Sequence, residues 1–146
     1  MGIVEAVCIS DEKGVRKVDM EDGMLIEGYG VKGDAHGGDS HRQISLLAME
    51  SIKKMQKQGL DVGPGDFGEN IVTSGIELAS LSVETKICLG DEAILRVSQI
   101  GKSCHDRCAI YYQAGDCIMP KEGIFGEVMK GGFIKKGDNI TIENDL

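Results

Sequence analysis

The first part of the chain alternates short apolar segments with polar and glycine residues. Residues 3–9 are rich in Val and Ile, and two shorter segments with apolar residues follow at 15–18 and 24–26. Short runs of β-branched and apolar residues that are bounded by Gly, Asp and Ser predict β-strands. We therefore expect one strand over residues 3–9 and two shorter strands at 15–18 and 24–26.

Two other segments have the spacing of a helix. In residues 47–58 the apolar side chains lie three or four positions apart, lysines occupy the opposite positions, and Gly59 follows. The apolar positions are Ala48, Ile52 and Met55. This pattern predicts an amphipathic helix that ends at the glycine. A second, shorter helix is predicted over residues 122–130, before a glycine pair. Its apolar residues are Ile124, Phe125 and Val128.

The second half of the chain uses one arrangement twice. A Gly-Asp pair follows both Leu89 and Lys136, and apolar residues then alternate with polar ones over 92–99 and 140–142. A tight turn followed by such alternation predicts a strand with one buried face. Short strands between glycine-rich turns, with too few helices for a parallel sheet, favour a closed or nearly closed β-barrel over an α/β sheet. The expected fold class is mainly β, with one main helix and short additional helices.

The composition agrees with this fold class. The chain has 146 residues, of which 41% are hydrophobic and 21 are glycine. This glycine content is about twice the average of ~7%, as expected for a fold with many tight turns. A chain of this length falls in the size range of one domain. No Pro-rich, Ser-rich or singly charged run marks a linker, so we expect a single domain over residues 1–146.

The charge of the chain excludes two classes of partner. Twenty-four acidic and 16 basic residues give a formal net charge of -8, which repels nucleic-acid phosphates and anionic lipid headgroups. The chain has no Trp and only 3 Tyr and 3 Phe, so it lacks the aromatic side chains on which single-stranded nucleic acids stack. No segment has the character of a membrane span or a signal peptide. We therefore expect a cytoplasmic protein that binds neither nucleic acid nor membranes.

The densest group of reactive side chains lies in residues 102–108, directly after the strand expected at 92–99. It combines two thiols with three basic side chains: Cys104, Cys108, Lys102, His105 and Arg107. Cations lower the pKa of a nearby thiol, and the thiolate is the form that acts as a nucleophile or a metal ligand. The sequence therefore predicts a reactive thiol. The alternative is a pair of buried, inert cysteines beside a solvated loop.

A zinc site is a second alternative for this segment. Four side chains of the right kind are available: Cys104, His105, Cys108 and Cys117. Structural zinc sites usually combine two closely spaced pairs of ligands, whereas Cys117 stands alone and His105 adjoins Cys104. The spacing therefore favours reactive thiols over zinc. Cys8 and Cys88 lie among strand-like apolar residues, so we expect them in the core.

The five cysteines also bear on the cellular compartment. An odd number of thiols is poorly suited to a disulfide framework, and a reducing compartment keeps thiols free. Both points agree with the expected cytoplasmic location. They also leave the thiols of residues 104 and 108 available for chemistry.

Residues 33–43 have the composition of a binding loop. This segment concentrates glycines, two of the three histidines and an arginine, and we take His36 and Arg42 as its candidate ligand-binding side chains. A glycine-rich backbone can wrap closely around an anionic or polar ligand. The sequence therefore predicts a loop that binds such a ligand.

Residues 63–73 form a second glycine-rich segment. Three glycines precede Glu69 and Asn70, which stand at the start of an expected strand. These two polar side chains are candidates for binding a ligand at the mouth of that strand. The alternative is a turn in which Asp66 and Asn70 only satisfy backbone groups.

Three of these segments together resemble the MOSC family, which is named after the C-terminal domain of molybdenum cofactor sulfurase. The segments are His36-Gly37-Gly38, then Phe67-Gly68-Glu69-Asn70-Ile71 with Gly75, then Cys104 to Cys108. Their order and spacing also match, and residues 131–138 look like the closing turn and strand of that family. The resemblance covers nearly the whole chain, and it implies a MOSC-type β-barrel.

The resemblance also implies a function for the cysteines: binding the molybdenum cofactor (molybdopterin) or carrying activated sulfur. In family members that reduce N-hydroxylated compounds the metal-binding cysteine follows an arginine, and Arg107-Cys108 looks like that pair. Cys108 is thus the implied metal ligand and catalytic residue, and Cys104 is the second choice. The implied cofactor-binding residues are Arg107, Lys102, His36, Arg42, Glu69 and Asn70. In those relatives an arginine precedes the Asn strand by two positions, where this chain has Gly68.

A partner protein is also expected. The chain has no pyridoxal-phosphate domain, which delivers the sulfur in two-domain sulfurases, and it has no flavin, haem or iron–sulfur motif. Sulfur or electrons would therefore come from a molybdenum cofactor biosynthesis protein, a sulfur-donor protein or an electron-transfer protein. No pyridoxal phosphate is expected on this chain itself.

The expected function is cofactor binding or persulfide carriage in molybdenum cofactor metabolism. One alternative is a molybdenum-dependent reductase of N-hydroxylated compounds that works with an external electron donor. The other is a small zinc-binding or thiol-redox module. Whether the chain itself catalyses a reaction stays open at this point.

Overall fold

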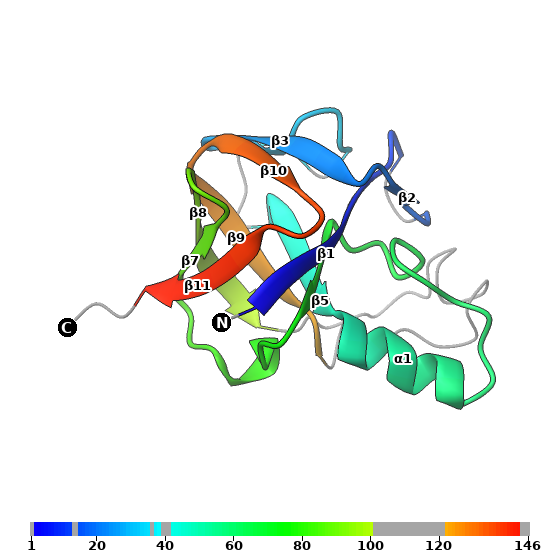
Figure 1. Cartoon of the computed structure of the whole chain (residues 1–146). Helices are drawn as coiled ribbons and strands as arrows, with labels where there is room; N and C mark the ends of the chain where they lie inside the picture. Colours follow the sequence, from blue (N-terminus) through cyan, green and yellow to red (C-terminus); the bar gives the residue numbers. More distant parts are fainter. Residues whose placement is uncertain (1, 13–14, 36, 39–41, 101–121, 144–146) are drawn as a thin grey trace.

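The computed structural model describes residues 2–12, 15–35, 37–38, 42–100 and 122–143. These residues include one α-helix, α1 (Met49–Lys57), and one short 3-10 turn, η1 (Leu78–Ser80). The rest of the described regular structure is β-strand (Figure 1). The strands are β1 (Gly2–Ile9), β2 (Val18–Asp19), β3 (Asp22–Ile26), β4 (Gly30–Val31), β5 (Ile44–Ala48), β6 (Ile71–Ser74), β7 (Lys86–Leu89), β8 (Ala93–Ile100), β9 (Ile124–Lys130), β10 (Gly132–Lys135) and β11 (Asn139–Glu143).

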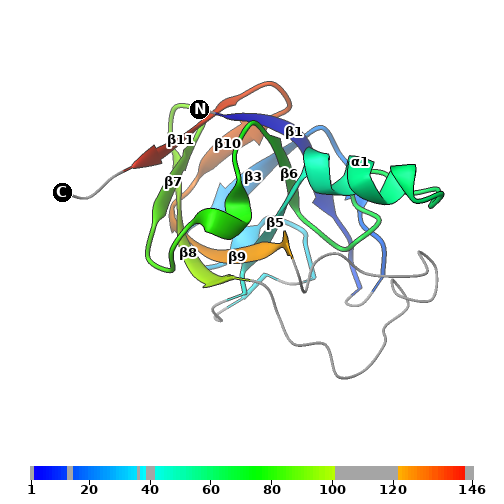
Figure 2. The ribbon, with the colours of Figure 1, turned by 90° about the horizontal axis from the view of Figure 1, so that it is seen from below.

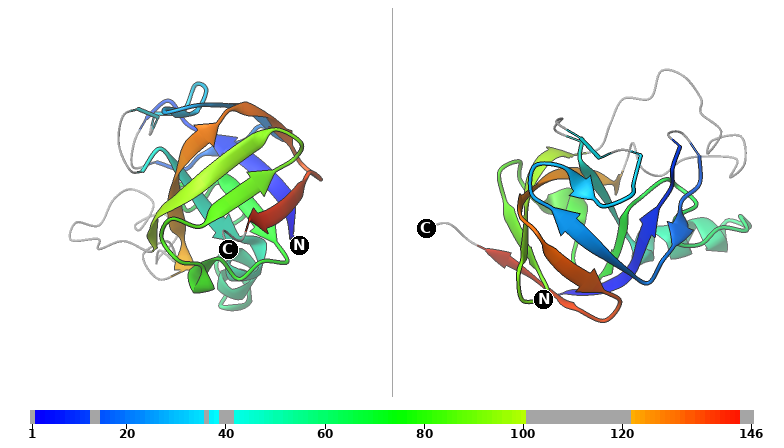
Figure 3. Two further views of the ribbon diagram at one scale, coloured as in Figure 1. Left: turned by 90° about the vertical axis from the view of Figure 1, so that its left-hand side faces the viewer. Right: turned by 90° about the horizontal axis from the view of Figure 1, so that it is seen from above.

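Seven of the described strands close into a barrel, in the order β1-β11-β7-β8-β9-β5-β6 and back to β1. The closing pair aligns Gly2 with Ile140. Adjacent barrel strands run antiparallel except β5 and β6, which are parallel because α1 and the loop after it cross between them. Figure 3 shows the strands around the barrel from two further sides. The predicted β-barrel is confirmed.

A three-stranded sheet, in the order β10-β3-β4, lies across one side of the barrel, uppermost in Figure 1. Its inner side chains, Leu25, Val31 and Ile134, belong to the same buried cluster as the barrel interior. On its outer face Phe133 pairs with Met24 across the two strands, and both side chains are about half exposed. The small sheet therefore covers one side of the core.

Alternation along the strands divides the buried apolar residues into two clusters. The larger cluster fills the barrel and includes Val4, Val7, Ile44, Ile71, Leu95 and Ile140. The smaller cluster lies outside the barrel and includes Leu47, Ile52, Met55, Phe67, Val72 and Phe125. Ile52 and Met55 come from α1, which packs beside β5 and β6 and which Figure 2 shows on the outside of the barrel. The helical spacing in the sequence thus correctly predicted the face that α1 buries.

The helix predicted over residues 122–130 is wrong, because residues 124–130 form strand β9. This strand lies between β5 and β8 and pairs with both. It also carries buried side chains on both faces, since Ile124 is in the barrel cluster and Phe125 is in the outer cluster. A strand that is buried on both faces has no polar alternation, so its spacing resembles a short buried helix.

The other predicted elements agree more closely with the structure. The helix predicted at 47–58 is α1, and the strand predicted at 3–9 is β1. The strand predicted at 24–26 lies within β3, whereas only Val18 of the segment 15–18 is in a strand. Lys17 is not part of a strand, because its side chain is buried in an ion pair and its backbone N–H donates a hydrogen bond to another loop. No helix in the described residues is both long and apolar enough to cross a membrane.

Candidate functional site

Five of the predicted site residues lie outside the residues that the structure describes: His36, Lys102, Cys104, Arg107 and Cys108. Residues 101–121, which contain both clustered cysteines, connect β8 to β9. The two strands pair at this point, with Ile100 aligned to Ile124. Both ends of the connection therefore lie side by side at one place on the barrel.

Arg42 lies beside both ends of this connection. Its Nε donates a hydrogen bond of 3.0 Å to Oε1 of Gln99 on β8. Its guanidinium lies 5.3 Å from the ring centroid of Phe125 on β9, a distance suited to a cation–π contact. The side chain is also exposed. Arg42 is thus a solvent-accessible cation held next to the points where the cysteine-containing segment leaves and rejoins the barrel.

Asn70, another predicted site residue, is buried, and its side chain forms hydrogen bonds with neighbouring strands of the protein. Its Nδ2 donates to the carbonyl oxygen of Cys8 at 3.1 Å, and its Oδ1 accepts hydrogen bonds from the backbone N–H and hydroxyl of Ser45 at 3.0 and 3.1 Å. The side chain therefore links β1 to β5 just before β6 begins. These hydrogen bonds satisfy backbone groups. They therefore match the alternative given for Asn70 above, in which its side chain bonds to the backbone and not to a ligand.

Glu69 is also buried, and its carboxylate closes the turn that precedes it. Its oxygens accept hydrogen bonds from the backbone N–H groups of Gly65 and Phe67 at 3.0 and 3.1 Å. Burial raises the pKa of this carboxyl group to about 7, although the backbone hydrogen bonds act in the opposite direction. Glu69 thus shapes the glycine-rich loop from inside.

A buried ion pair near Asn70 had no signal in the sequence. Nζ of Lys17 lies 2.6 Å from Oδ1 of Asp34, and both side chains are 0% exposed. The backbone N–H of Ser10 donates to the same carboxylate oxygen at 3.1 Å. Burial alone would raise the pKa of Asp34, but the hydrogen bond and charge of Lys17 hold it below its ordinary value. The pair stands 17 residues apart in sequence, so no local pattern could have predicted it.

The ion pair fixes the start of the loop that carries His36 and Arg42. Besides the bonds to Asp34, the N–H of Ala35 donates to the carbonyl oxygen of Ser10 at 2.8 Å, and the N–H of Gly38 donates to that of Tyr29 at 2.8 Å. The described backbone on both sides of position 36 is thus attached to Ser10, directly after β1, and to the turn before β4. The glycine-rich loop has a defined base.

The two cysteines expected in the core differ from each other. Cys8 is fully buried in the outer cluster, and burial raises the pKa of its thiol, so it matches the expectation. Cys88 does not, because it faces outward from β7 and is only partly buried, with its Sγ 4.0 Å from a carboxylate oxygen of Glu143. Within the part of the chain that the structure describes, no three His, Cys, Asp or Glu side chains are arranged to hold a metal ion.

Comparison with known proteins agrees with this fold. The model of the MOSC domain family matches residues 32–141, and the chain therefore belongs to that family. The structure is similar to that of the YUAD protein from Bacillus subtilis, with a TM-score of 0.79 and 23% identity over 97% of this chain and 96% of that chain.

Two further crystal structures are also similar. YiiM from Geobacillus stearothermophilus gives a TM-score of 0.74 at 16% identity, over 99% of this chain and 76% of that chain. YiiM from Escherichia coli gives 0.68 at 18% identity, over 99% and 71%. At these identities the likeness establishes the fold alone. A search of curated proteins finds no match.

Proposed function

We propose that this MOSC domain binds the molybdenum cofactor, or carries sulfur as a persulfide, through Cys108. The observation that carries the proposal is the family match over residues 32–141, which spans both glycine-rich loops and both clustered cysteines. The position of Arg42 supports it, because this cation lies beside the ends of the cysteine-containing segment. In this proposal Cys104 has a secondary role.

The described residues fit an anionic cofactor. The guanidinium of Arg42 is exposed and held in place by Gln99 and Phe125, so it can pair with a phosphate without first being ordered. Gly33 and Gly38 have positive φ angles, and a Cβ at Gly38 would meet no atom within 4 Å. The Cβ side of Gly38 is therefore open among the described atoms, and we propose that a polar ligand lies against this backbone.

The remaining polar residues divide between direct and supporting roles. We assign the contacts with the anion to Arg42, His36, Lys102 and Arg107. Glu69 and Asn70 contribute from inside, because their buried side chains hold the backbone of the loops in place. When bound, the cofactor would supply a molybdenum ion held by two dithiolene sulfurs, to which a cysteine thiolate is a suitable soft ligand.

Sulfur carriage would use the same thiolate. The Cys108 thiolate attacks the outer sulfur of a persulfide on a donor protein, a new S–S bond forms on Cys108, and the donor cysteine leaves as a thiolate. The step needs no added oxidant, because the transferred sulfur arrives already in the persulfide state. The cations near Cys108 in the sequence favour its thiolate form.

The test compares wild type with Cys108→Ser and Cys104→Ser, all expressed in a host that makes the cofactor. A serine hydroxyl has nearly the shape of a thiol but ionises too weakly to act as a soft ligand or a sulfur nucleophile. We expect Cys108→Ser to lose bound molybdenum or cyanide-releasable sulfur with an unchanged melting temperature, and Cys104→Ser to lose only part.

Two results would contradict the proposal. If Cys108→Ser keeps the molybdenum and the sulfur of the wild type, the cysteine has no such role. If both variants lose zinc and are equally destabilised, the segment is a structural zinc site instead.

A further inference from the structure

We propose that the exposed face of α1 binds an acidic partner protein. The helix carries Lys53, Lys54 and Lys57, and Glu50 in the first turn is its acidic residue. The identification of this partner as the donor of sulfur or electrons rests on the proposed function, whereas the binding itself does not. A cluster of lysines stands out in a chain whose formal net charge is -8.

Within the described part of the chain, two of these lysines form no ion pair. Lys54 pairs with the carboxylate of Glu122, but Lys53 and Lys57 are exposed and form no ion pair with the described carboxylates. They stand four residues apart, so they lie on the same side of the helix, about 6 Å apart along its axis. Like charges at this spacing repel each other, and an anionic surface would relieve that repulsion.

Two other surface cations of the described residues are already neutralised, whereas Lys32, Lys130 and Lys136 are exposed elsewhere on the chain. Arg96 pairs with Glu84 and Glu127, and Lys135 pairs with Asp138. The positive charge on α1 is thus available to a partner, whereas the charge of these residues is largely used within the molecule.

The kind of partner follows from the rest of the surface. Ile52 and Met55 of α1 are buried against the barrel, so Lys53 and Lys57 on the opposite, exposed side offer charge to a partner. Extended polyanions such as DNA or a membrane would also meet the acidic remainder of the molecule and be repelled. A compact protein with a cluster of carboxylates can contact α1 alone. Charge complementarity of this kind steers association and sets orientation.

The location of α1 relates this surface to the proposed site. The hydroxyl of Ser51 donates a hydrogen bond of 2.6 Å to the carboxylate of Glu122, and Lys54 pairs with the same carboxylate. Glu122 directly follows the segment that contains Cys104 and Cys108. A partner seated on α1 therefore lies next to one end of that segment.

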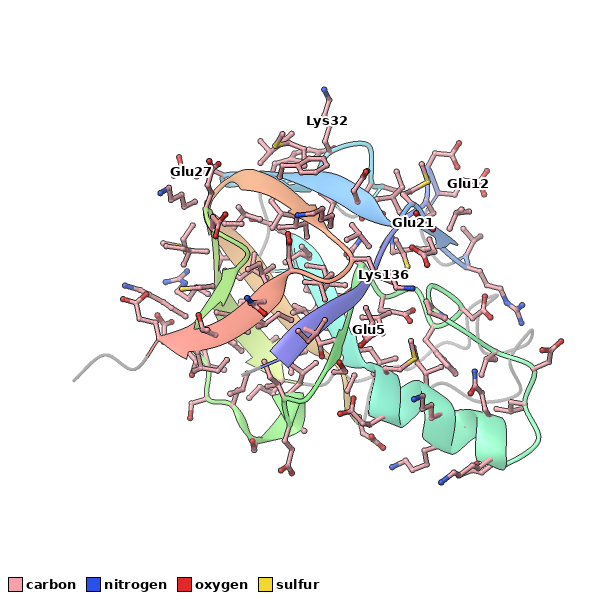
Figure 4. The ribbon with its side chains drawn as sticks, viewed as in Figure 1. Glu5, Glu12, Glu21, Glu27, Lys32 and Lys136 are labelled. Atoms are coloured by element: carbon pink, nitrogen blue, oxygen red, sulfur yellow. The ribbon has the colours of Figure 1, made fainter. Side chains whose placement is uncertain are left out.

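The experiment uses the whole chain without cofactor and a fluorescent octaglutamate peptide as the probe, with octaglutamine as the uncharged control. The double charge reversal K53E/K57E removes the proposed surface. The matched control is K32E/K136E, which changes the net charge by the same amount. Lys32 and Lys136 are exposed; in Figure 4 Lys32 lies at the top and Lys136 near the middle, and both are away from α1 at the lower right.

We expect octaglutamate to bind at low salt, to shift the amide resonances of α1, and to dissociate as salt increases. K53E/K57E should raise the Kd of octaglutamate by about tenfold or more, and K32E/K136E by about twofold at most. The second effect is smaller because salt screens charges that lie far from the bound peptide. Circular dichroism checks that both variants stay folded.

Three results would overturn the inference: no binding of octaglutamate, equal weakening by the two double variants, or tighter binding to duplex DNA or phosphatidylserine vesicles. Failure of the proposed function gives a different pattern. In that case α1 still binds the acidic probe, while Cys108→Ser retains the molybdenum and sulfur of the wild type.

Discussion

The two ends of strand β1 are held by different means. At its C-terminal end, three loops meet around buried polar side chains: residues 15–17, 32–35 and 63–70, which we call the loop end. At its N-terminal end, the tight turns at 90–91 and 136–138, the turn end, are joined by a backbone hydrogen bond from Gly90 to Asn139. The loop end depends on buried side chains that are far apart in sequence, and the turn end on tight turns and backbone hydrogen bonds. The same kind of substitution should therefore change the free energy of unfolding by very different amounts at the two ends.

The largest contrast should come from breaking one ion pair at each end. Lys17→Met leaves the carboxylate of Asp34 buried without its cation, which should lower the free energy of unfolding by about 3–5 kcal/mol. Lys135→Met breaks the exposed pair with Asp138 and should have a far smaller effect. Urea unfolding of both variants measures the difference.

The double variant Lys17→Met/Asp34→Leu sharpens this result. Removing both charges should recover a large part of the loss, because the cost lies in the unpaired charge rather than in the absence of the pair. Equal destabilisation by Lys17→Met and Lys135→Met would contradict the contrast between the ends.

A smaller contrast should follow from adding one methyl group at each end. Gly65 has a φ of 89°, and a Cβ there would lie 2.2 Å from the carbonyl oxygen of Lys17. Gly65→Ala should therefore cost roughly 2–4 kcal/mol, from the left-handed backbone plus the displacement of the facing loop.

Gly137 is the matched position at the turn end. Its φ is 94°, but a Cβ would meet nothing within 4 Å. Gly137→Ala should cost only about 1 kcal/mol, from the backbone conformation alone. Thermal unfolding of the two variants checks the order, and a larger loss for Gly137→Ala would show that the contact with Lys17 carries little strain.

The smallest contrast concerns pH. Burial raises the pKa of Glu69 from 4.5 to about 7, so the folded state holds the proton more tightly than the unfolded state. The stability from this group is complete below pH 4.5 and is lost as the pH rises through 7. Relative to Glu69→Gln, the wild type should lose about 1–3 kcal/mol over that range.

Asp138 at the turn end should respond in the opposite direction. The hydrogen bonds and charge of Lys135 outweigh the effect of burial and lower the pKa of this carboxyl group below 3.8. Its contribution is present above pH 3.8 and is lost as the pH falls through the lowered value. Unfolding curves of wild type, Glu69→Gln and Asp138→Asn from pH 3 to 8 test both signs. Parallel curves for wild type and Glu69→Gln would show that Glu69 does not titrate in this range.

The contrast between the ends also explains how much of the fold could be predicted. The strands that follow the turns at 90–91 and 137–138 show clear alternation, because each has one face toward the barrel core. The helix α1 was predictable for a similar reason, since it buries one side. Strand β9 was missed because both of its faces are covered, and the pairing of β1 with β11 left no local signal at all.

The candidate site divides in the same way. The glycine-rich loops and Arg42 could be selected from the sequence. Glycine lets the backbone approach a ligand closely, and arginine binds anions by charge-assisted hydrogen bonds. The inward role of Glu69 and Asn70 was predictable only as an alternative, since a sequence does not show which way a side chain points. The ion pair between Lys17 and Asp34 could not be foreseen, because only the folded barrel brings the two residues together.

The pairing that closes the barrel has a consequence for synthesis on the ribosome. Strand β1 is made first, but its partner β11 contains residues 139–143, so almost the whole domain must be translated before the two can meet. One edge of strand β7 also stays unpaired until β11 is translated. Until then, these two strand edges are open to pairing with other chains. The edges of β1 and β7 should therefore need protection by chaperones until β11 leaves the exit tunnel.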